Sequence, residues 1–229
     1  MKTIGLIGGT SWPSTIEYYR KLNELVVERL GGFHSAKLLL KSIDYHDIKS
    51  DYAAGWHKVP NLLRDEITEF LTHKPDCLII CNMTLHKAID LIADDIAISI
   101  PFFHAVDLTA KAARAKNYRQ VLLLATKFTM DDGFFAKRLE SDGLKVIVPN
   151  IKERLEIQAI QTELAAGHMK AEFSHDLIGL IKRYSTCDAV VLACTELPLA
   201  VTPLQSPLPL LNPVALQCTA AVDFALATS

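Results

Sequence analysis

The 229-residue chain lacks the clustered basic residues that bind nucleic acids and the long apolar runs that cross a bilayer. It carries 24 Lys and Arg against 26 Asp and Glu, a formal net charge of −2, and no block of basic residues. It therefore lacks the clustered cations that phosphate backbones require. Apolar runs such as Val121–Ala125 are far shorter than the roughly 20 residues that span a membrane. The N-terminus enters a strand-like pattern at once, without the apolar stretch of a signal peptide. We expect a cytoplasmic protein without nucleic-acid or membrane partners.

The cysteines and histidines form no recognised framework. The five cysteines show no CxxC spacing, and the eight histidines show neither HxxxH nor HExxH spacing. A disulfide framework and a zinc site are therefore not expected, and most of the thiols should be free and buried. The cysteines are Cys77, Cys81, Cys187, Cys194 and Cys218.

Short apolar runs alternate with amphipathic stretches of helical length. The predicted strands are Ile4–Gly8, Ala36–Ile43, Cys77–Cys81, Ile100–His104, Val121–Ala125, Leu144–Val148 and Ala189–Cys194. The predicted helices are Ser14–Arg29, Asn61–Thr72, Lys87–Ile92, Asp131–Ser141, Arg154–Ala166, Ser174–Tyr184 and Val214–Leu226. This alternation predicts an α/β fold of parallel sheets flanked by helices.

The two halves of the chain resemble each other. The segment Asp76–Asn82 aligns without a gap on Asp188–Cys194, because each is an acid followed by an apolar strand and a polar strand end. Likewise Ile4–Gly8 aligns on Val121–Ala125. The repeat predicts two similar α/β domains related by pseudo-twofold symmetry. The first would comprise residues 1–107 and 208–229, and the second residues 108–207.

The repeat also predicts where a site would lie. Open α/β sheets bind ligands beyond the carboxyl ends of their strands. Asn82 and Cys194 each end one of the aligned strands. If the two domains face each other, these residues are expected on opposite walls of one cleft, with the active site between the domains.

Two strand ends carry residues that suit chemistry. Cys194 begins Cys194-Thr195-Glu196, where backbone N–H groups could lower the pKa of the thiol and make it a base or nucleophile. The alternative is a buried structural thiol. Gly8-Gly9-Thr10 forms a turn whose N–H groups suit a carboxylate, although a simple strand-to-helix turn is an equal alternative.

The segment after the third predicted strand is Asn82-Met83-Thr84-Leu85-His86. The Thr84 hydroxyl and nearby N–H groups could hold a carboxylate. His86 is interpreted as a hydrogen-bonded structural residue. Cys81 is expected in the core, because neighbouring side chains of a strand point to opposite faces.

Several motifs along almost the whole chain together resemble one family. They are Gly8-Gly9-Thr10-Ser11-Trp12-Pro13-Ser14-Thr15, Tyr18-Tyr19-Arg20, Gly31-Gly32-Phe33-His34-Ser35-Ala36-Lys37, Phe128-Thr129-Met130, Cys194-Thr195-Glu196 and Ala221-Val222-Asp223-Phe224. In order and spacing these residues are similar to the aspartate/glutamate racemases, above all the branch with a GGMSWEST-like opening. The resemblance implies an isomerase that uses neither pyridoxal phosphate nor metal, and that is commonly a homodimer.

The resemblance also implies roles for individual residues. Two bases on opposite faces of a small amino acid would invert its α carbon, and Cys194 matches the base of the second domain. The substrate would be bound by Thr10, Met83, Thr84, Thr195, Glu196 and the position of Glu156. The base position of the first domain is occupied by Asn82.

This chain departs from the family pattern at several positions. Asn82 cannot exchange a proton at neutral pH, so Cys81 or a water would have to replace the missing base. Glu156 stands where a lysine is expected, and its charge would repel an acidic group. Asn212 and Gln217 replace an acid and a histidine of a late motif. The expected function is an aspartate- or glutamate-type racemase with one base replaced. The alternatives are a single-cysteine decarboxylase or isomerase, and a non-catalytic protein that binds small carboxylates.

Overall fold

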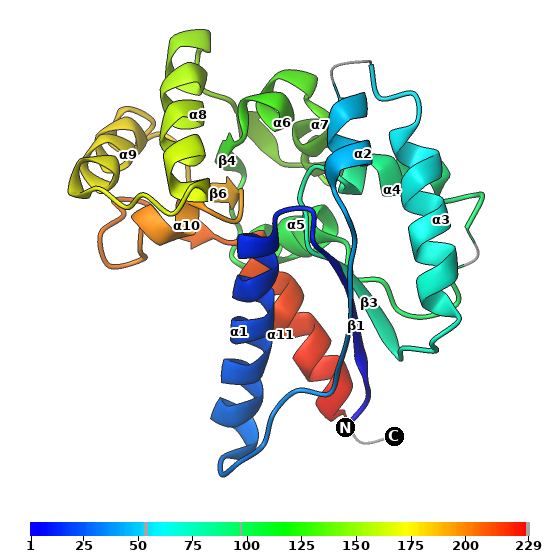
Figure 1. Ribbon diagram of the computed structural model, residues 1–229. Helices are drawn as coiled ribbons and strands as arrows, with labels where there is room; N and C mark the ends of the chain where they lie inside the picture. The colour runs from blue at the N-terminus through cyan, green and yellow to red at the C-terminus, as the bar shows by residue number, and fades with distance from the viewer. Residues whose placement is uncertain (53–54, 97, 228–229) are drawn as a thin grey trace. The chain divides into compact units, whose positions relative to one another are not determined.

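The computed structural model describes residues 1–52, 55–96 and 98–227. The chain divides into two compact units. Unit 1 comprises Met1–His104 and Gln217–Ser229, and unit 2 comprises Ala105–Leu216. Each unit holds one parallel β-sheet flanked by helices (Figure 1). The predicted fold class, α/β with two parallel sheets, is confirmed.

Unit 1 is built on a three-stranded sheet in the order β2-β1-β3. All residues of β1 and β3 are buried, which explains why both read as continuous apolar runs. Figure 1 shows α1 and α11 on one side of this sheet and α3 and α4 on the other. The elements are β1 (Ile4–Gly8), α1 (Trp12–Leu30), β2 (Leu38–Ser42), α2 (His46–Asp51), α3 (Val59–Leu71), β3 (Cys77–Ile80), α4 (His86–Ile92) and α11 (Pro213–Leu226).

Unit 2 is built on a four-stranded sheet in the order β5-β4-β6-β7. Its central strand β6 is buried along its whole length. The elements are α5 (Ala105–Ala115), β4 (Gln120–Ala125), α6 (Lys127–Asp132), α7 (Phe134–Ser141), β5 (Lys145–Ile147), α8 (Ile151–Ala165), α9 (Ala171–Arg183), β6 (Ala189–Ala193), α10 (Leu197–Ala200) and β7 (Leu210–Leu211).

The strand pairing reproduces the internal repeat in register. Ile4 pairs with Cys77 in unit 1, and Val121 pairs with Ala189 in unit 2, as the aligned segments require. An acid precedes each of the two later strands and binds the start of its neighbour. The carboxylate of Asp76 accepts a hydrogen bond from the N–H of Thr3 at 2.6 Å. The carboxylate of Asp188 accepts one from the N–H of Gln120 at 2.8 Å. The two halves therefore share both sheet register and strand-start contacts.

The fourth strand position shows the same correspondence, although one of the two strands is reduced to a bridge. The N–H of Leu78 donates to Pro101 at 2.9 Å, and the N–H of Val190 donates to Pro209 at 2.8 Å. In unit 2 this pairing forms β7. In unit 1 it is an isolated bridge between Leu78 and Phe102, so the predicted strand Ile100–His104 is wrong. Pro101 lacks an N–H group, which limits the ladder there.

The predicted domain boundaries differ from those of the two units. The first lies after His104 rather than after residue 107, because α5 begins at Ala105. The second lies after Leu216 rather than after residue 207. Residues 208–216 stay with unit 2 because they contain β7, which pairs with β6.

Most predicted helices lie within a few residues of the observed ones, but the segment Asp131–Ser141 is an exception. It contains the end of α6 and all of α7, which are separated by Gly133. Gly133 has a φ of 79°, a conformation that ends a helix and that glycine adopts without strain. The sequence patterns did not predict α2, α5, α10 or β7.

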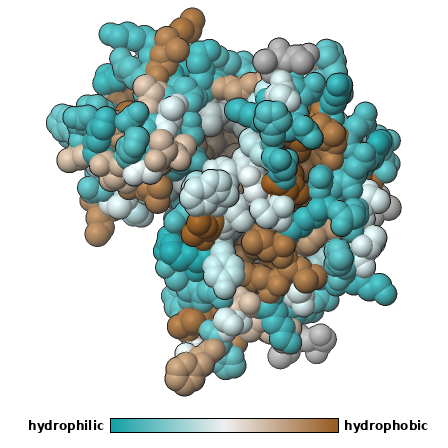
Figure 2. All heavy atoms as spheres, viewed as in Figure 1, coloured by the Kyte–Doolittle hydropathy of each residue, from teal (hydrophilic) through white to brown (hydrophobic). Residues whose placement is uncertain are grey.

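Helix α1 has an apolar side that faces solvent. Its exposed large side chains are spaced three or four residues apart, except for a gap of eight residues between Tyr19 and Val27, and their exposed fractions lie between 44% and 68%. They are Trp12, Ile16, Tyr19, Val27 and Leu30. Figure 2 shows hydrophobic and near-neutral residues beside hydrophilic ones on the surface over α1. Among the described residues, no helix has the length and apolar character required to cross a membrane.

Candidate active site

Cys194 follows the last residue of β6, at the carboxyl end of the sheet of unit 2. Its side chain is buried, with 3% exposed. Its Sγ donates a hydrogen bond to Glu196 Oε2 at 2.9 Å, and Thr195 Oγ1 donates to the same oxygen at 2.8 Å. The structure therefore brings together the three predicted residues of this motif. They form a thiol and a hydroxyl that both point at one carboxylate.

Burial and the charge of Glu196 together keep this thiol protonated. Burial raises the pKa of Cys194 well above its ordinary value, and the neighbouring Glu196 carboxylate raises it further. The N–H groups of Glu196 and Leu197 act in the opposite direction but do not prevail. The expected lowering of the pKa by backbone N–H groups is thus wrong, because burial and the Glu196 carboxylate outweigh it. Cys194 is therefore a protonated thiol that donates its hydrogen bond to the Glu196 carboxylate.

Asn82 lies in the turn between β3 and α4, at the carboxyl end of the sheet of unit 1. Its Oδ1 accepts a hydrogen bond from the N–H of Leu85 at 3.0 Å. The N–H of His86 donates to the carbonyl of Met83 at 3.3 Å, which closes the same turn. The Asn82 side chain therefore stabilises the turn that leads into α4, as asparagine commonly does through hydrogen bonds to nearby backbone N–H groups.

A buried chain of hydrogen bonds fixes this turn to α11. The carbonyl of Asn82 can only accept, so His86 Nδ1 carries the proton of their 2.9 Å hydrogen bond. His86 Nε2 then accepts from the Gln217 amide at 3.3 Å. The same amide nitrogen donates to Phe103 at 2.8 Å, and Gln217 Oε1 accepts from Tyr18 at 2.6 Å. Each of these donors therefore meets an acceptor.

Burial keeps the His86 imidazole neutral. Burial lowers the pKa of His86 to about 3, and the nearby His104 ring contributes to the decrease. The prediction that His86 is a hydrogen-bonded structural residue is confirmed by its complete burial and its two ring contacts. Gln217, which stands at the position of a histidine in the family pattern, is the partner that the sequence did not reveal.

Thr10 carries an isolated hydroxyl at the end of β1. Its side chain is 2% exposed, and its Oγ1 has no hydrogen-bond partner among the described residues. The neighbouring N–H of Gly9, by contrast, donates to Thr15 Oγ1 at 3.0 Å. Buried polar groups in proteins are nearly always paired, so the Thr10 hydroxyl is a candidate donor to a polar ligand atom. The predicted carboxylate pocket thus keeps the Thr10 hydroxyl but loses the Gly9 N–H group.

The remaining predicted residues of unit 1 are all buried. Met83 is 5% exposed and Thr84 is 9% exposed, both in the turn that Asn82 caps. Cys81 is fully buried, as predicted, and burial raises its pKa well above the ordinary value, with Cys218 contributing. A proton route through Cys81 is therefore poorly suited to this site.

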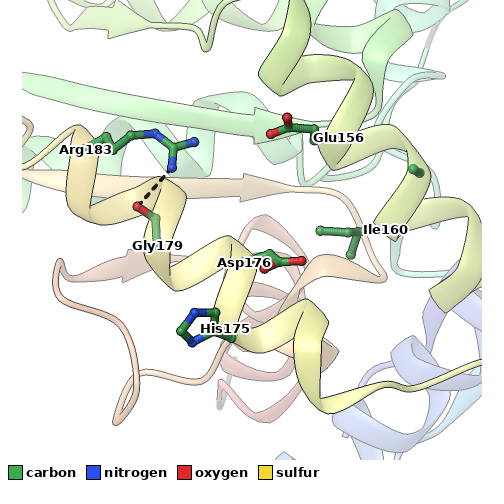
Figure 3. Close-up of a pocket in the computed structure, with 7 residues that line it drawn as sticks. Glu156, Ile160, His175, Asp176, Gly179 and Arg183 are labelled. Atoms are coloured by element: carbon green, nitrogen blue, oxygen red, sulfur yellow. Dashed lines mark hydrogen bonds between the residues drawn. The ribbon is translucent and has the colours of Figure 1, made fainter.

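Glu156 has a different setting from the other predicted residues. It is exposed on α8 and lines an open groove of about 540 Å³ between α8 and α9. Figure 3 shows Glu156 and Ile160 on α8 and, on α9, His175, Asp176 and Arg183. Glu156 takes no part in the hydrogen bonds that join Cys194, Thr195 and Glu196.

The chain matches a known protein family along almost its whole length. The family model described as Asp/Glu/hydantoin racemase matches residues 7–221. The chain belongs to the Asp/Glu/hydantoin racemase family.

Solved structures of this family cover the whole fold. The chain is 34% identical to a Yersinia pestis protein assigned to the Asp/Glu racemases, with a TM-score of 0.89 and coverage of 99% of this chain and 100% of the other. An aspartate racemase homologue from Pyrococcus horikoshii OT3 is 28% identical, with a TM-score of 0.88 and the same coverage.

A curated relative is more distant. The glutamate racemase of Actinobacillus pleuropneumoniae serotype 3 (strain JL03) is 25% identical over 132 residues, which are 58% of this chain and 49% of the relative. The chain thus spans about half the length of the curated relatives it matches.

Proposed function

We propose that this protein is a cofactor-independent racemase of an aspartate- or glutamate-like amino acid, with Cys194 as one of its bases. The family supports racemisation as the reaction class. The observation that carries the proposal is the buried Cys194 thiol at the end of β6, hydrogen-bonded to Glu196. A base at this position must lose its proton before it can take one from the substrate.

The contact with Glu196 provides a route for that proton. The Cys194 Sγ–H bond points at Glu196 Oε2 across 2.9 Å, so transfer yields a thiolate and a carboxylic acid. The N–H groups of Glu196 and Leu197 then stabilise the thiolate, because both hydrogen-bond the sulfur. The ammonium group of a bound amino acid would favour the same ionisation through its positive charge. Thr195 holds the carboxylate in place through its own hydrogen bond.

In unit 1 we assign substrate binding to the strand ends. The unpaired, buried hydroxyl of Thr10 would donate to the substrate carboxylate, and this contact would complete its hydrogen bonding. The turn of Asn82, Met83 and Thr84 lies at the same edge of the sheet, since β1 and β3 are parallel neighbours. The buried Thr10 hydroxyl suits the carboxylate of a small acidic amino acid.

The test is exchange of the α proton for deuterium. The purified protein is incubated in D₂O with L- or D-aspartate or L- or D-glutamate, and NMR follows the loss of the α proton and the appearance of the other enantiomer. The wild type is expected to exchange and invert at least one of the two amino acids. Cys194→Ala is expected to lose inversion by at least about 100-fold, the typical contribution of a positioned acid or base. Unchanged inversion in this variant would refute the role of Cys194.

A decarboxylase that uses one thiol is a second candidate, because Asn82 cannot exchange a proton. It predicts no exchange with any of the four amino acids and release of CO₂ from a small dicarboxylic acid, with loss of that activity in Cys194→Ala. Binding of a dicarboxylate without turnover would instead indicate the non-catalytic alternative, visible as ligand-induced thermal stabilisation.

We also propose that the exposed apolar side of α1 pairs with that of a second copy of the chain. Its two aromatic side chains, Trp12 and Tyr19, are 68% and 55% exposed. Aromatic side chains bury roughly 150–250 Å² each when covered. With the exposed parts of Ile16, Val27 and Leu30, the stripe supplies much of the roughly 800 Å² per partner of a standard interface. A helix of 19 residues is about 28 Å long, so two such stripes can pair along their length.

A further inference from the structure

The exposed side of α1 has a repeat that continues through a polar centre. Its apolar residues are interrupted between Tyr19 and Val27, and the half-buried Asn23 lies midway in that gap. With Asn23 included, successive residues are four, three, four, four and three positions apart, the spacing of a helix that packs along a second helix. At about 100° per residue, all of them lie within about 80° of the helix circumference. This set, the α1 stripe, comprises Trp12, Ile16, Tyr19, Asn23, Val27 and Leu30.

Both polar atoms of the Asn23 side chain are engaged within its own chain. Nδ2 donates to the carbonyl of Tyr19 at 2.8 Å, and Oδ1 accepts from the N–H of Ala36 at 3.0 Å. Burial of Asn23 under a second helix would therefore leave neither atom without a hydrogen-bond partner. The contact with Ala36 also fastens the segment that follows α1 to the middle of the helix.

Phe33 projects from that segment into solvent. Gly31 and Gly32 have φ values of 69° and 56°, which glycine adopts without strain, and they turn the chain at the end of the helix. The N–H of Gly31 donates to the carbonyl of Val27 at 2.8 Å, so the turn is joined to the last turn of α1. The Phe33 side chain is fully exposed, with a value of 107%. It lies three residues after Leu30 and extends the α1 stripe beyond the helix, and contiguous apolar patches of this kind mark binding surfaces.

The α1 stripe is symmetrical about Asn23. Ile16 and Leu30 lie seven residues before and after it, and Tyr19 and Val27 lie four residues before and after it. A twofold axis through Asn23, perpendicular to the helix, therefore places each member of a pair against the other member in a second, antiparallel copy. The large Tyr19 then meets the smaller Val27, and the two helix dipoles are opposed. A parallel pair would instead place each side chain against itself and align the dipoles.

We propose that two copies of the chain pair antiparallel along the α1 stripe, with Asn23 at the twofold axis and Phe33 of each copy covering Trp12 of the other. This inference rests on the α1 dimer proposed above and adds its register. Phe33 lies ten residues after Asn23, so it reaches the first turn of the second helix, where Trp12 is 68% exposed. Because Trp12 lies two residues after Thr10, the second copy covers the start of α1 beside the proposed donor to the substrate.

Cross-linking between introduced cysteines tests the register. The five native cysteines are buried, so a short bis-maleimide reacts first with exposed thiols. The double variant Ile16→Cys, Leu30→Cys is expected to give covalent dimers, whereas neither single variant is. The two positions are about 21 Å apart along one helix, and a reagent shorter than this distance cannot bridge them within one chain.

The other outcomes of this experiment are distinct. Covalent dimers in each single variant would indicate a parallel pair, and a protein that is dimeric in light scattering but gives no cross-link would indicate a different interface. Either result would overturn the proposed register and leave dimer formation itself intact. A wild type that is monomeric in light scattering would refute the α1 dimer, and with it this inference.

The contact between Phe33 and Trp12 has its own test. Phe33→Ala is expected to raise the dissociation constant of the dimer at least about tenfold, as loss of an aromatic anchor does at an interface. Leu91→Ala is the matched control, because it removes a side chain that is 61% exposed on α4, outside the α1 stripe. Since both side chains are exposed, circular dichroism is expected to show an unchanged fold for each variant. A dissociation constant of Phe33→Ala equal to that of the wild type would overturn the role of Phe33.

Tryptophan fluorescence reports the same contact directly. The chain has two tryptophans, and Trp56 is buried with 7% exposed, so a change on dimer formation arises from Trp12. At concentrations where both proteins are dimeric, Phe33→Ala is expected to emit at longer wavelength than the wild type, because Trp12 has lost its cover. Identical emission from the two dimers would overturn the contact.

Discussion

The buried His86 should make the stability of unit 1 sensitive to mild acid. In the unfolded chain its imidazole has an ordinary pKa of 6.5, whereas in the folded protein burial lowers the pKa to about 3. Between these values the unfolded chain binds a proton that the folded protein does not. The free energy of unfolding therefore falls as the pH decreases through 6.5, and it continues to fall until about pH 3.

The size of this effect follows from the shift. One pH unit within the window changes the free energy of unfolding by about 1.4 kcal/mol, and the change from pH 7 to pH 5 amounts to about 2 kcal/mol. Replacement by asparagine removes the titrating ring but keeps an N–H group near the position of Nδ1, facing the carbonyl of Asn82. We expect His86→Asn to be less stable than the wild type at pH 7 and to lose most of this pH dependence.

Urea unfolding followed by circular dichroism at pH 5, 6 and 7 measures the difference in slope between wild type and variant. His73→Asn is the matched control, since its side chain is 59% exposed and removes an imidazole from the surface of unit 1. Comparison between variants cancels the titration of the carboxylates, which is common to all of them. An equal slope for His86→Asn and the wild type would refute a neutral, buried His86 with a lowered pKa.

Three further outcomes are expected. Tyr18→Phe should destabilise the protein by about 1–3 kcal/mol in urea unfolding, because it leaves the buried Oε1 of Gln217 without its donor, and an unchanged midpoint would contradict that network. Glu196→Gln should lower the pKa of Cys194, because the thiol loses a neighbouring negative charge. The pH dependence of thiolate absorbance near 240 nm measures this pKa, with Cys194→Ala as the reference. An unshifted titration in Glu196→Gln would contradict the role of Glu196. Trp12→Lys should convert a dimer to a monomer in light scattering at micromolar concentration, whereas Leu204→Lys, at a side chain 99% exposed outside α1, should not.

The sequence identified the strands of the core because they are buried along their whole length. Ile4–Gly8 was predicted with its observed bounds, and the strand predicted at Cys77–Cys81 is observed at Cys77–Ile80. The internal repeat aligned corresponding positions of the two sheets, and in the structure Asp76 and Asp188 each bind the start of the neighbouring strand. Continuous apolar runs and their flanking acids are local features, so they can be recognised in the amino-acid sequence alone.

Elements with weak local signals were found only in the structure. The strand predicted at Ile100–His104 is a bridge, and the two residues of β7 are defined by pairing with β6 rather than by their own pattern. The observed domain boundary lies after Leu216 rather than after residue 207, because β7 pairs with β6 in unit 2. Whether such a short segment forms a strand depends on its pairing with a distant segment, and its own sequence does not show that pairing.

For the candidate site, the sequence by itself determined which residues end the strands. Cys194, Asn82 and Thr10 follow buried apolar runs, and parallel sheets place their ligand-binding groups at that edge. The tertiary structure alone decided how these residues are protonated and partnered. Burial and the charge of Glu196 reversed the expected pKa of Cys194. Burial against segments distant in the sequence keeps His86 neutral, with Gln217 of α11 hydrogen-bonded to its ring. Both effects depend on desolvation and on atoms far apart in the chain, which is why no local pattern contained them.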